Sequence, residues 1–197
     1  AVTLAGTGVN WTRCRTMLSD SPSSFAVTAN ATPLVVWSYE LAPGEVINMQ
    51  AVVIGNSQNT EDRSVFHIAQ SAVKDGDELS YDAQTGNFTL GLMVTGATSG
   101  ATGRIVADAD GGATGTLTLR SLIGNFIDNE IITDTGTGSA TVNGFLVSQN
   151  AALLGSIASL ETAYESDATT ACVFTVSGSY AQVTVTGVAA KNLEWTC

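Results

Sequence analysis

Positive charge is scarce in this chain. It has 7 lysines and arginines against 18 aspartates and glutamates, which gives a net charge of −11. A nucleic-acid groove needs clustered Lys and Arg to displace counterions from phosphates. Here Arg13 and Arg15 form the one close pair, and the other basic residues are scattered. We therefore predict that the protein does not bind DNA or RNA, since an acidic surface repels nucleic acid.

Long apolar runs are also missing. The chain is 44% hydrophobic and 13% charged, which is too apolar for a disordered protein. It has no stretch of about 18 apolar residues that could cross a bilayer. Its first residues, AVTLAGTGVNWTRC, lack the basic stretch and apolar core of a secretion signal. We expect no membrane association and one large or two small domains with a real core.

Cysteine is too rare for the common zinc sites. The 3 cysteines, Cys14, Cys172 and Cys197, include no CxxC pair, so the ligand spacing of a zinc site is absent. Cys172 lies in the apolar run ACVFTV and is predicted to be a small buried hydrophobe. The odd count argues against a disulfide framework, and a bridge between Cys14 and Cys197 stays open.

Alternation with a period of two is abundant. The segments rich in β-branched and aromatic residues are 31–41, 45–55, 62–73 and 169–190. Short strands at about 10-residue spacing, separated by turn residues, argue for an all-β sandwich or barrel. Only the segment 150–167 has helical spacing, and its position between strands favours a strand followed by a loop.

The composition changes near residue 86. From there to about residue 148, Gly, Thr and Ala dominate, and the segment 98–110 resembles 136–147. We interpret this region as a separate β unit of about 60 residues. The flanking segments 77–84 and 152–160 are expected to pair as a hairpin, because insertions are tolerated at exposed hairpin tips.

The predicted fold is therefore all-β with an insertion. Residues 25–85 and 149–197 form an antiparallel, jelly-roll-like β-sandwich. Residues 86–148 form a small inserted domain, either β-barrel-like or a second β-sandwich. Residues 1–24, rich in small polar side chains, form an N-terminal arm that is expected to order on binding.

The stretch TGATSGATGRIVADADGGATGTL (95–117) invites comparison with phosphate-binding and calcium-binding loops. A P-loop needs a lysine after its last glycine, but Gly103 is followed by Arg104. An EF-hand that begins at Asp108 needs a glutamate at its twelfth position, which here is Leu119. Both loop types are thus excluded, and we predict no cofactor.

Asp108 and Asp110 leave two interpretations. With Asp134 they would make a looser cation site, or they belong to a polar Asp-Gly turn between two strands. We favour the turn and predict no metal site. The glycines then supply the positive φ that tight turns require.

Catalytic groups are hard to assemble from this sequence. His67 is the single histidine and lies in mid-strand, with no motif around any serine. Acid–base catalysis usually uses His or paired carboxylates, and the carboxylates here lie in turn-like segments typical of a solvated rim. Trp37 and Trp195 lie in apolar strands and are expected to anchor the core. We predict no catalytic residues and no enzymatic activity.

Two parts of the chain resemble virion proteins of tailed bacteriophages. The outer part is LAPGEVINMQAVVIGNSQNTEDRSVFHIAQSAVKDG followed by LLGSIASLETAYESDATTACVFTVSGSYAQVTVTGVAAKNLEWT. It resembles a virion β-sandwich module that ends in a VTGxxxxxxxW closure, which Val185-Thr186-Gly187 and Trp195 match. The inserted part, TGATSGATGRIVADADGGATGTLTLRSLIGNFIDNEIITDTGTGSATVNG, looks like a small β module recurrent in phage structural proteins.

The resemblance implies a location in the virion and no reaction. Proteins with this module include capsid decoration (cement) proteins and pieces of tail fibres or spikes. Decoration proteins are usually compact homotrimers that bind the outer face of the major capsid protein and stabilise contacts between capsomers. Fibres usually carry long repeats or a tail-attachment domain, and neither is seen in these 197 residues. The resemblance therefore favours capsid decoration by a protein made in the host cytoplasm.

The alternative is a tail fibre, spike or receptor-binding module that recognises a host surface glycan or protein. In the favoured case, the arm and the adjacent sandwich edge would contact the capsid or a neighbouring subunit, because exposed strand edges invite pairing. The inserted unit would project outward. The candidate contact residues in the arm are Trp11, Arg13, Arg15 and Met17.

Overall fold

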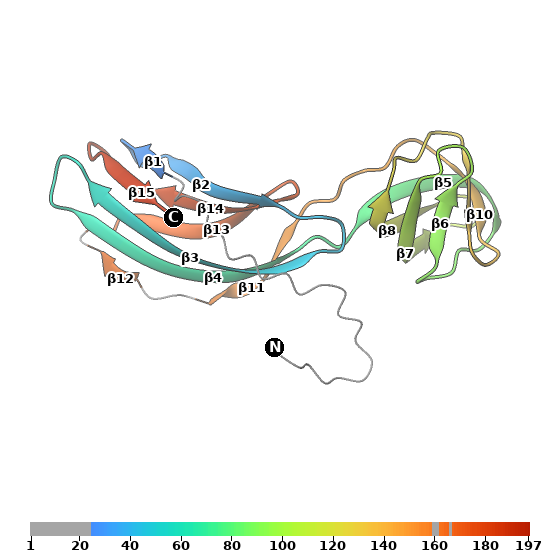
Figure 1. Ribbon diagram of the computed structural model, residues 1–197, viewed down its shortest axis with the longest axis horizontal. Helices are drawn as coiled ribbons and strands as arrows, with labels where there is room; N and C mark the ends of the chain where they lie inside the picture. Colours follow the sequence, from blue (N-terminus) through green and yellow to red (C-terminus); the bar gives the residue numbers. More distant parts are fainter. Residues whose placement is uncertain (1–24, 159–161, 166) are drawn as a thin grey trace.

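The computed structural model describes residues 25–158, 162–165 and 167–197, and this part of the chain is all-β. Figure 1 shows two bodies along the long axis, a sandwich of two sheets and a small barrel, joined by two chain segments. All strand pairs are antiparallel, and the barrel is a closed ring of β5 to β10. The predicted fold class, a sandwich with an inserted small β domain, is confirmed.

The larger sheet of the sandwich has the strand order β1-β15-β3-β4-β11, and β12 also pairs with β4. Its strands are β1 (Phe25–Thr28), β3 (Val46–Ser57), β4 (Arg63–Val73), β11 (Ala152–Ala158), β12 (Thr162–Glu165) and β15 (Leu193–Thr196). The long central pair, β3 and β4, runs without a register shift from Val46 opposite Val73 to Asn56 opposite Arg63. The expectation of a strand within 150–167 is confirmed by β11 and β12.

The smaller sheet has the order β13-β14-β2 and packs on the larger one. Its strands are β2 (Pro33–Glu40), β13 (Ala171–Ser177) and β14 (Tyr180–Thr186). The alternating segment 169–190 forms the hairpin of β13 and β14, with Ser177 opposite Tyr180 and Gly178 at a φ of +57° in the turn. Such a φ favours glycine because a side chain there is strained.

Alternating burial explains why these segments form a sandwich. In β4, Phe66 and Ile68 are buried and His67 between them is exposed, so one face of the strand is apolar. Trp195 is fully buried, as predicted, and its indole Nε1 donates a hydrogen bond to Thr28 Oγ1 at 2.8 Å. The Trp195 ring leaves no room for a side chain at Gly55, where a Cβ atom would lie 2.6 Å from it.

The inserted barrel has the strand order β10-β5-β8-β7-β6-β9 and is closed by the pairing of β9 with β10. Its strands are β5 (Asp77–Gly86), β6 (Met93–Gly96), β7 (Thr102–Asp110), β8 (Gly115–Ile123), β9 (Ile131–Asp134) and β10 (Ser139–Val142). A separate core fills it, with fully buried side chains from Leu79, Ile105, Leu117, Leu119 and Ile132. Small barrels are filled by side chains in this way.

The predicted start of the insertion is corrected. β5 pairs with β8 and β10, so residues 77–86 belong to the barrel and not to the sandwich. The expected hairpin between 77–84 and 152–160 is therefore wrong. Instead β11 pairs with β4, with Ala152 opposite Val73, and the barrel lies at the tip of this hairpin. Alternation identified 77–84 as a strand but carries no information on which sheet the strand joins.

Cys172 is buried in the sandwich core, as predicted. Burial raises the pKa of its thiol to about 12, so it stays protonated at neutral pH. Cys197 has a free, partly buried thiol, and Cys14 lies outside the described residues. The residues that the structure describes contain no helix long and apolar enough to span a membrane.

Candidate functional site

The Gly-rich stretch 95–117 forms strands and turns of the barrel. It runs from the end of β6 through β7 to the start of β8. Gly100 and Gly112 adopt φ values of +68° and +94° in the two connecting turns. Asp110 Oδ1 accepts the backbone N–H of Gly112 at 2.7 Å, as expected for an Asp-Gly turn. The turn interpretation of this stretch is confirmed.

The three aspartates of the alternative cation site do not converge. Asp108 accepts the hydroxyl of the buried Tyr81 at 2.9 Å, and burial raises the pKa of its carboxyl group. Asp134 instead accepts the backbone N–H groups of Thr89, Gly136 and Gly138. Across the described ranges no group of three or more His, Cys, Asp or Glu side chains is placed to hold a metal ion.

Glu130 organises the loops at one end of the barrel. Its buried carboxylate accepts backbone N–H groups of Thr98 (3.1 Å), Ser99 (2.9 Å) and Ile127 (2.7 Å), and also the Ser99 hydroxyl (2.8 Å). Burial opposes the ionisation of Glu130, but these hydrogen bonds outweigh it and lower the pKa. Sequence reasoning missed this role, because Thr98 and Ser99 lie 32 and 31 residues away along the chain.

A buried ion pair lies where the two bodies meet. The ammonium group of Lys74, 3% exposed, contacts Asp77 Oδ1 at 2.9 Å. It also donates to the hydroxyls of Ser148 (2.9 Å) and Ser179 (3.2 Å). Lys74 and Ser179 belong to the sandwich side, Asp77 begins the barrel, and Ser148 lies on the returning segment. The ion pair therefore ties the barrel to the sandwich.

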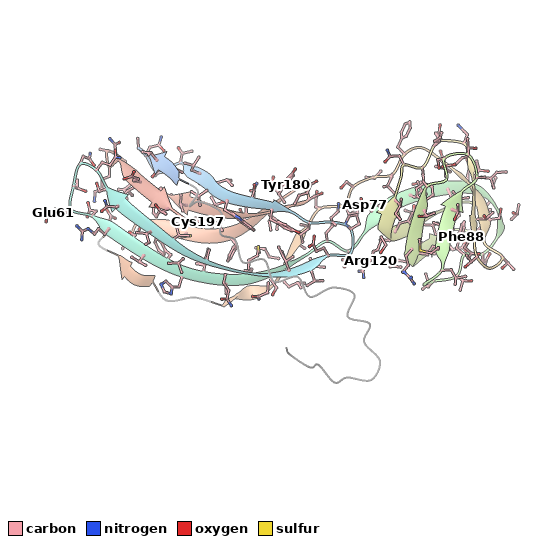
Figure 2. The ribbon with its side chains drawn as sticks, viewed as in Figure 1. Glu61, Asp77, Phe88, Arg120, Tyr180 and Cys197 are labelled. Carbon is pink, nitrogen blue, oxygen red and sulfur yellow. The ribbon has the colours of Figure 1, made fainter. Side chains whose placement is uncertain are left out.

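Further contacts support this junction. Figure 2 shows Asp77 and Arg120 between the two bodies. The Arg120 guanidinium donates to the backbone carbonyl of Asp75, and its methylene groups lie against Gly44. A shallow pocket of about 350 Å³ is lined here by Glu40, Leu41, Ala42, Pro43, Lys74, Asp77 and Ser148. The Lys74 ammonium already contacts Asp77, Ser148 and Ser179, which matches its three N–H donors. The pocket therefore offers no free cation to an anionic ligand.

The sandwich leaves part of one strand edge unpaired. β15 pairs with β3 only from Ile54 to Ser57. Among the residues that the structure describes, no strand pairs with Val46–Val53 on this side of β3. β4 occupies the opposite side of β3 along its whole length.

Backbone hydrogen bonds show which residues of β3 face β4. The N–H of Lys74 donates to the carbonyl of Glu45 at 3.0 Å, one step beyond the pair Val46 and Val73. The N–H of Ser57 donates to the carbonyl of Asp62 at the other end. Because bonding alternates along an antiparallel strand, the odd-numbered residues of β3 bond to β4.

The even-numbered residues face the other side. The N–H of Gln58 donates to the carbonyl of Asn192 at 2.9 Å, next to β15. Where β15 ends, the same alternation leaves the N–H and C=O groups of the even-numbered residues without a strand partner among the residues that the structure describes. We call this set the open edge; it comprises Val46, Asn48, Gln50 and Val52.

The outer face along the open edge mixes apolar and polar side chains. Val46 and Val52 are 61% and 53% exposed, and Asn48 and Gln50 between them are also exposed. On the inner face Met49 and Val53 are buried in the core, whereas Ile47 and Ala51 are half-buried and pack against it. Ile47 and Ala51 are thus the inner-face side chains that an added strand could cover further.

The facing sheet contributes two aromatic rings. Trp37 and Tyr39 of β2 stack with their centroids 6.3 Å apart and are half-buried. The Tyr39 hydroxyl donates to Glu45 Oε1 at 2.9 Å, and Glu45 Oε2 accepts the N–H of Ala42. Neither β2 nor β3 carries a lysine or an arginine. Glu45 therefore places one negative charge at the start of the open edge, and Arg120 lies against the neighbouring Gly44.

The residues proposed as contacts from the sequence, Trp11, Arg13, Arg15 and Met17, lie outside the described residues. His67 is exposed on the outer face of β4, opposite Val52. The comparisons with known proteins add no relative: no family model, no curated protein and no solved structure matches the chain.

Proposed function

We propose that this protein is a non-enzymatic structural component of a tailed-bacteriophage virion. It acts as a capsid decoration (cement) protein that binds the outer face of the major capsid protein as a homotrimer and stabilises contacts between capsomers. The observation that carries the proposal is the division of the molecule. A sandwich with an open strand edge carries a fully closed barrel at one end, next to the start of β3 (Figure 1).

The physical properties of the two bodies support this role. An unpaired strand edge is a template for pairing with another chain. The net charge of −11 suits a surface that faces away from packaged nucleic acid. The sequence resemblance to virion modules points the same way.

Copy number per particle tests the proposal. The protein is quantified against the major capsid protein in purified virions by gel densitometry and mass spectrometry. Decoration predicts about one copy per capsid subunit, or one trimer at each local threefold position. A few copies per particle would contradict it and move the protein to the tail.

A receptor-binding module of the tail is the second candidate. It is favoured by large apolar side chains exposed on the barrel, where Phe145 is 73%, Ile123 70% and Leu90 60% exposed. Exposed apolar groups of this size mark interaction sites when they gather in one patch. The test is binding of the purified protein to host cells, compared with the variant Phe145→Ser. Binding that this variant loses would favour the tail assignment.

A further inference from the structure

The open edge of β3 is shaped to accept one more strand. We propose that it binds an extended segment of the partner protein by strand addition, and that this segment has alternating apolar side chains flanked by Lys or Arg. The inference rests on the proposed function, for which it supplies the contact that holds the partner. In strand addition, main-chain hydrogen bonds give affinity and alternate side chains give specificity.

The space for this segment along the open edge, which we call the slot, has two defined ends. At one end Thr196 of β15 pairs with Ile54, so an incoming strand cannot extend farther. At the other end the chain leaves the sheet at Glu45, whose N–H bonds back to the carbonyl of Ala42 at 2.9 Å. Between them, Val46–Val52 offers about seven residues, or roughly 23 Å of strand.

An added strand would complete the hydrogen bonding and the core together. It would pair with the N–H and C=O groups of the open edge, which point outward in the described structure. Its inward-facing side chains would cover Ile47 and Ala51 further. Because every second side chain of a strand faces inward, the segment needs apolar residues at alternate positions.

The open edge lacks the features by which proteins protect their sheet edges. Lysine, proline, bulges and short strands all discourage edge pairing. Of the other edge strands, β1 and β12 are short, β2 begins with Pro33 and has a register shift, and β11 also has a register shift. β13 is regular as well, but at seven residues it is shorter than β3. β3 has no lysine or proline and pairs with β4 without a shift. An edge that is long, regular and unprotected is suited to pairing.

Charge selects between the two possible kinds of strand. Glu45 lies at one end of the slot, and the whole chain has a net charge of −11. A second copy would bring like charges together, whereas a segment with Lys or Arg at its ends would be attracted. The partner is therefore a different protein rather than another copy of this chain.

A proline at position 50 tests the pairing. Gln50→Pro removes an N–H that faces the slot and leaves every β3–β4 hydrogen bond in place, since proline is tolerated at a solvent-facing edge. Gln50→Ala changes the same side chain and keeps the N–H. We expect Gln50→Pro to load onto virions stripped of the protein at least about tenfold less tightly than wild type, and Gln50→Ala to load normally. Equal loading of the two variants, with unchanged melting temperatures, would overturn the inference.

Hydrogen exchange supplies a readout at the open edge itself. In the free protein the amides of Asn48, Gln50 and Val52 should exchange fast, and those of Ile47 and Met49 slowly, because only the latter bond to β4. On the particle, the three fast amides should become protected. Loading without this protection would place the contact elsewhere and refute strand addition at β3.

A peptide probe separates this inference from the proposed function. The probe is a labelled synthetic peptide of alternating Val and Thr with two Lys at each end, and its control has Glu in place of Lys. Wild-type protein should bind the Lys peptide more tightly than the Glu peptide, and Gln50→Pro should bind neither. If this holds and virions do not load, the decoration role fails and the strand site stands. If virions load and the peptide does not bind, the strand site fails.

Light scattering tests the other occupant. If purified wild-type protein forms an oligomer that Gln50→Pro splits in the absence of virions, the open edge is filled by a second copy. That result would overturn the assignment to a different protein. An unchanged oligomeric state in Gln50→Pro is the expected outcome.

Discussion

The sandwich and the barrel differ in how completely their strand edges are paired. Both are antiparallel, and each has its own apolar core. The barrel pairs β9 with β10 and so satisfies every strand on both sides. In the sandwich, β15 pairs only with Ile54–Ser57 at the end of β3 and leaves the open edge. A closed barrel has no free strand edge, whereas an incompletely paired sheet has an edge to which another chain can add a strand.

The largest expected effect comes from emptying one of the two cores. Trp195→Ala removes the largest fully buried side chain of the sandwich and its bond to Thr28, at a cost of about 3–5 kcal/mol. Calorimetry should show the sandwich transition moving to lower temperature while the barrel transition stays in place. Leu117→Ala in the barrel core is the matched control and should move only the other transition. A single transition that shifts equally in both variants would show that the two bodies unfold as one unit.

Removing the ion pair at the junction should let the sandwich and the barrel move more freely relative to each other. Lys74→Met leaves Asp77 buried without its cation, which should destabilise the protein by about 3 kcal/mol. Small-angle scattering should then report a wider spread of overall lengths. Ser179→Ala, which removes one weaker contact at 3.2 Å, should have a smaller effect of the same kind. An unchanged scattering profile in Lys74→Met would assign the fixed arrangement to the backbone contacts alone.

Glu130 should make the stability of the barrel fall at low pH. Its folded pKa lies below the ordinary value of 4.5, so the unfolded chain takes up a proton more readily. The stabilisation is then fully present above about pH 4.5 and is lost as the pH falls through the folded pKa. Glu130→Gln should lower barrel stability by about 1–3 kcal/mol at pH 7 and flatten this acid dependence. Asp128→Asn is the comparison, and thermal melts from pH 7 to 3 give both curves.

The smallest effect on stability should come from the N-terminal arm. A variant lacking residues 1–18 should melt at the wild-type temperature, because the core residues that the structure describes all lie later in the chain. Our arm hypothesis predicts that it nevertheless loses occupancy on virions. Undiminished occupancy would refute a role for the arm and leave the open edge as the attachment surface.

The sequence predicts local structure here better than strand partners. Alternation in β4 correctly assigns Phe66 and Ile68 to the core and His67 to the surface, because burial follows a period of two. It also identifies 77–84 as a strand. It cannot say that this strand joins β8 and β10, since pairing depends on groups that every strand backbone shares.

The candidate site was the least predictable part. The open edge exists because β15 ends opposite Ile54, and nothing in the residues 46–52 themselves encodes the length of β15. Similarly, the burial of Lys74 depends on Asp77, Ser148 and Ser179 meeting in space. The Asp-Gly turn at Asp110 was predictable, because its hydrogen bond is local.

The barrel is inserted between β4 and β11, two strands that pair with each other, so it could be removed or replaced without changing that pairing. Ala152 already lies opposite Val73, so a short turn in place of residues 74–151 would leave an ordinary hairpin. Replacing residues 74–151 would therefore exchange the barrel and keep the strands of both sandwich sheets, including the open edge of β3.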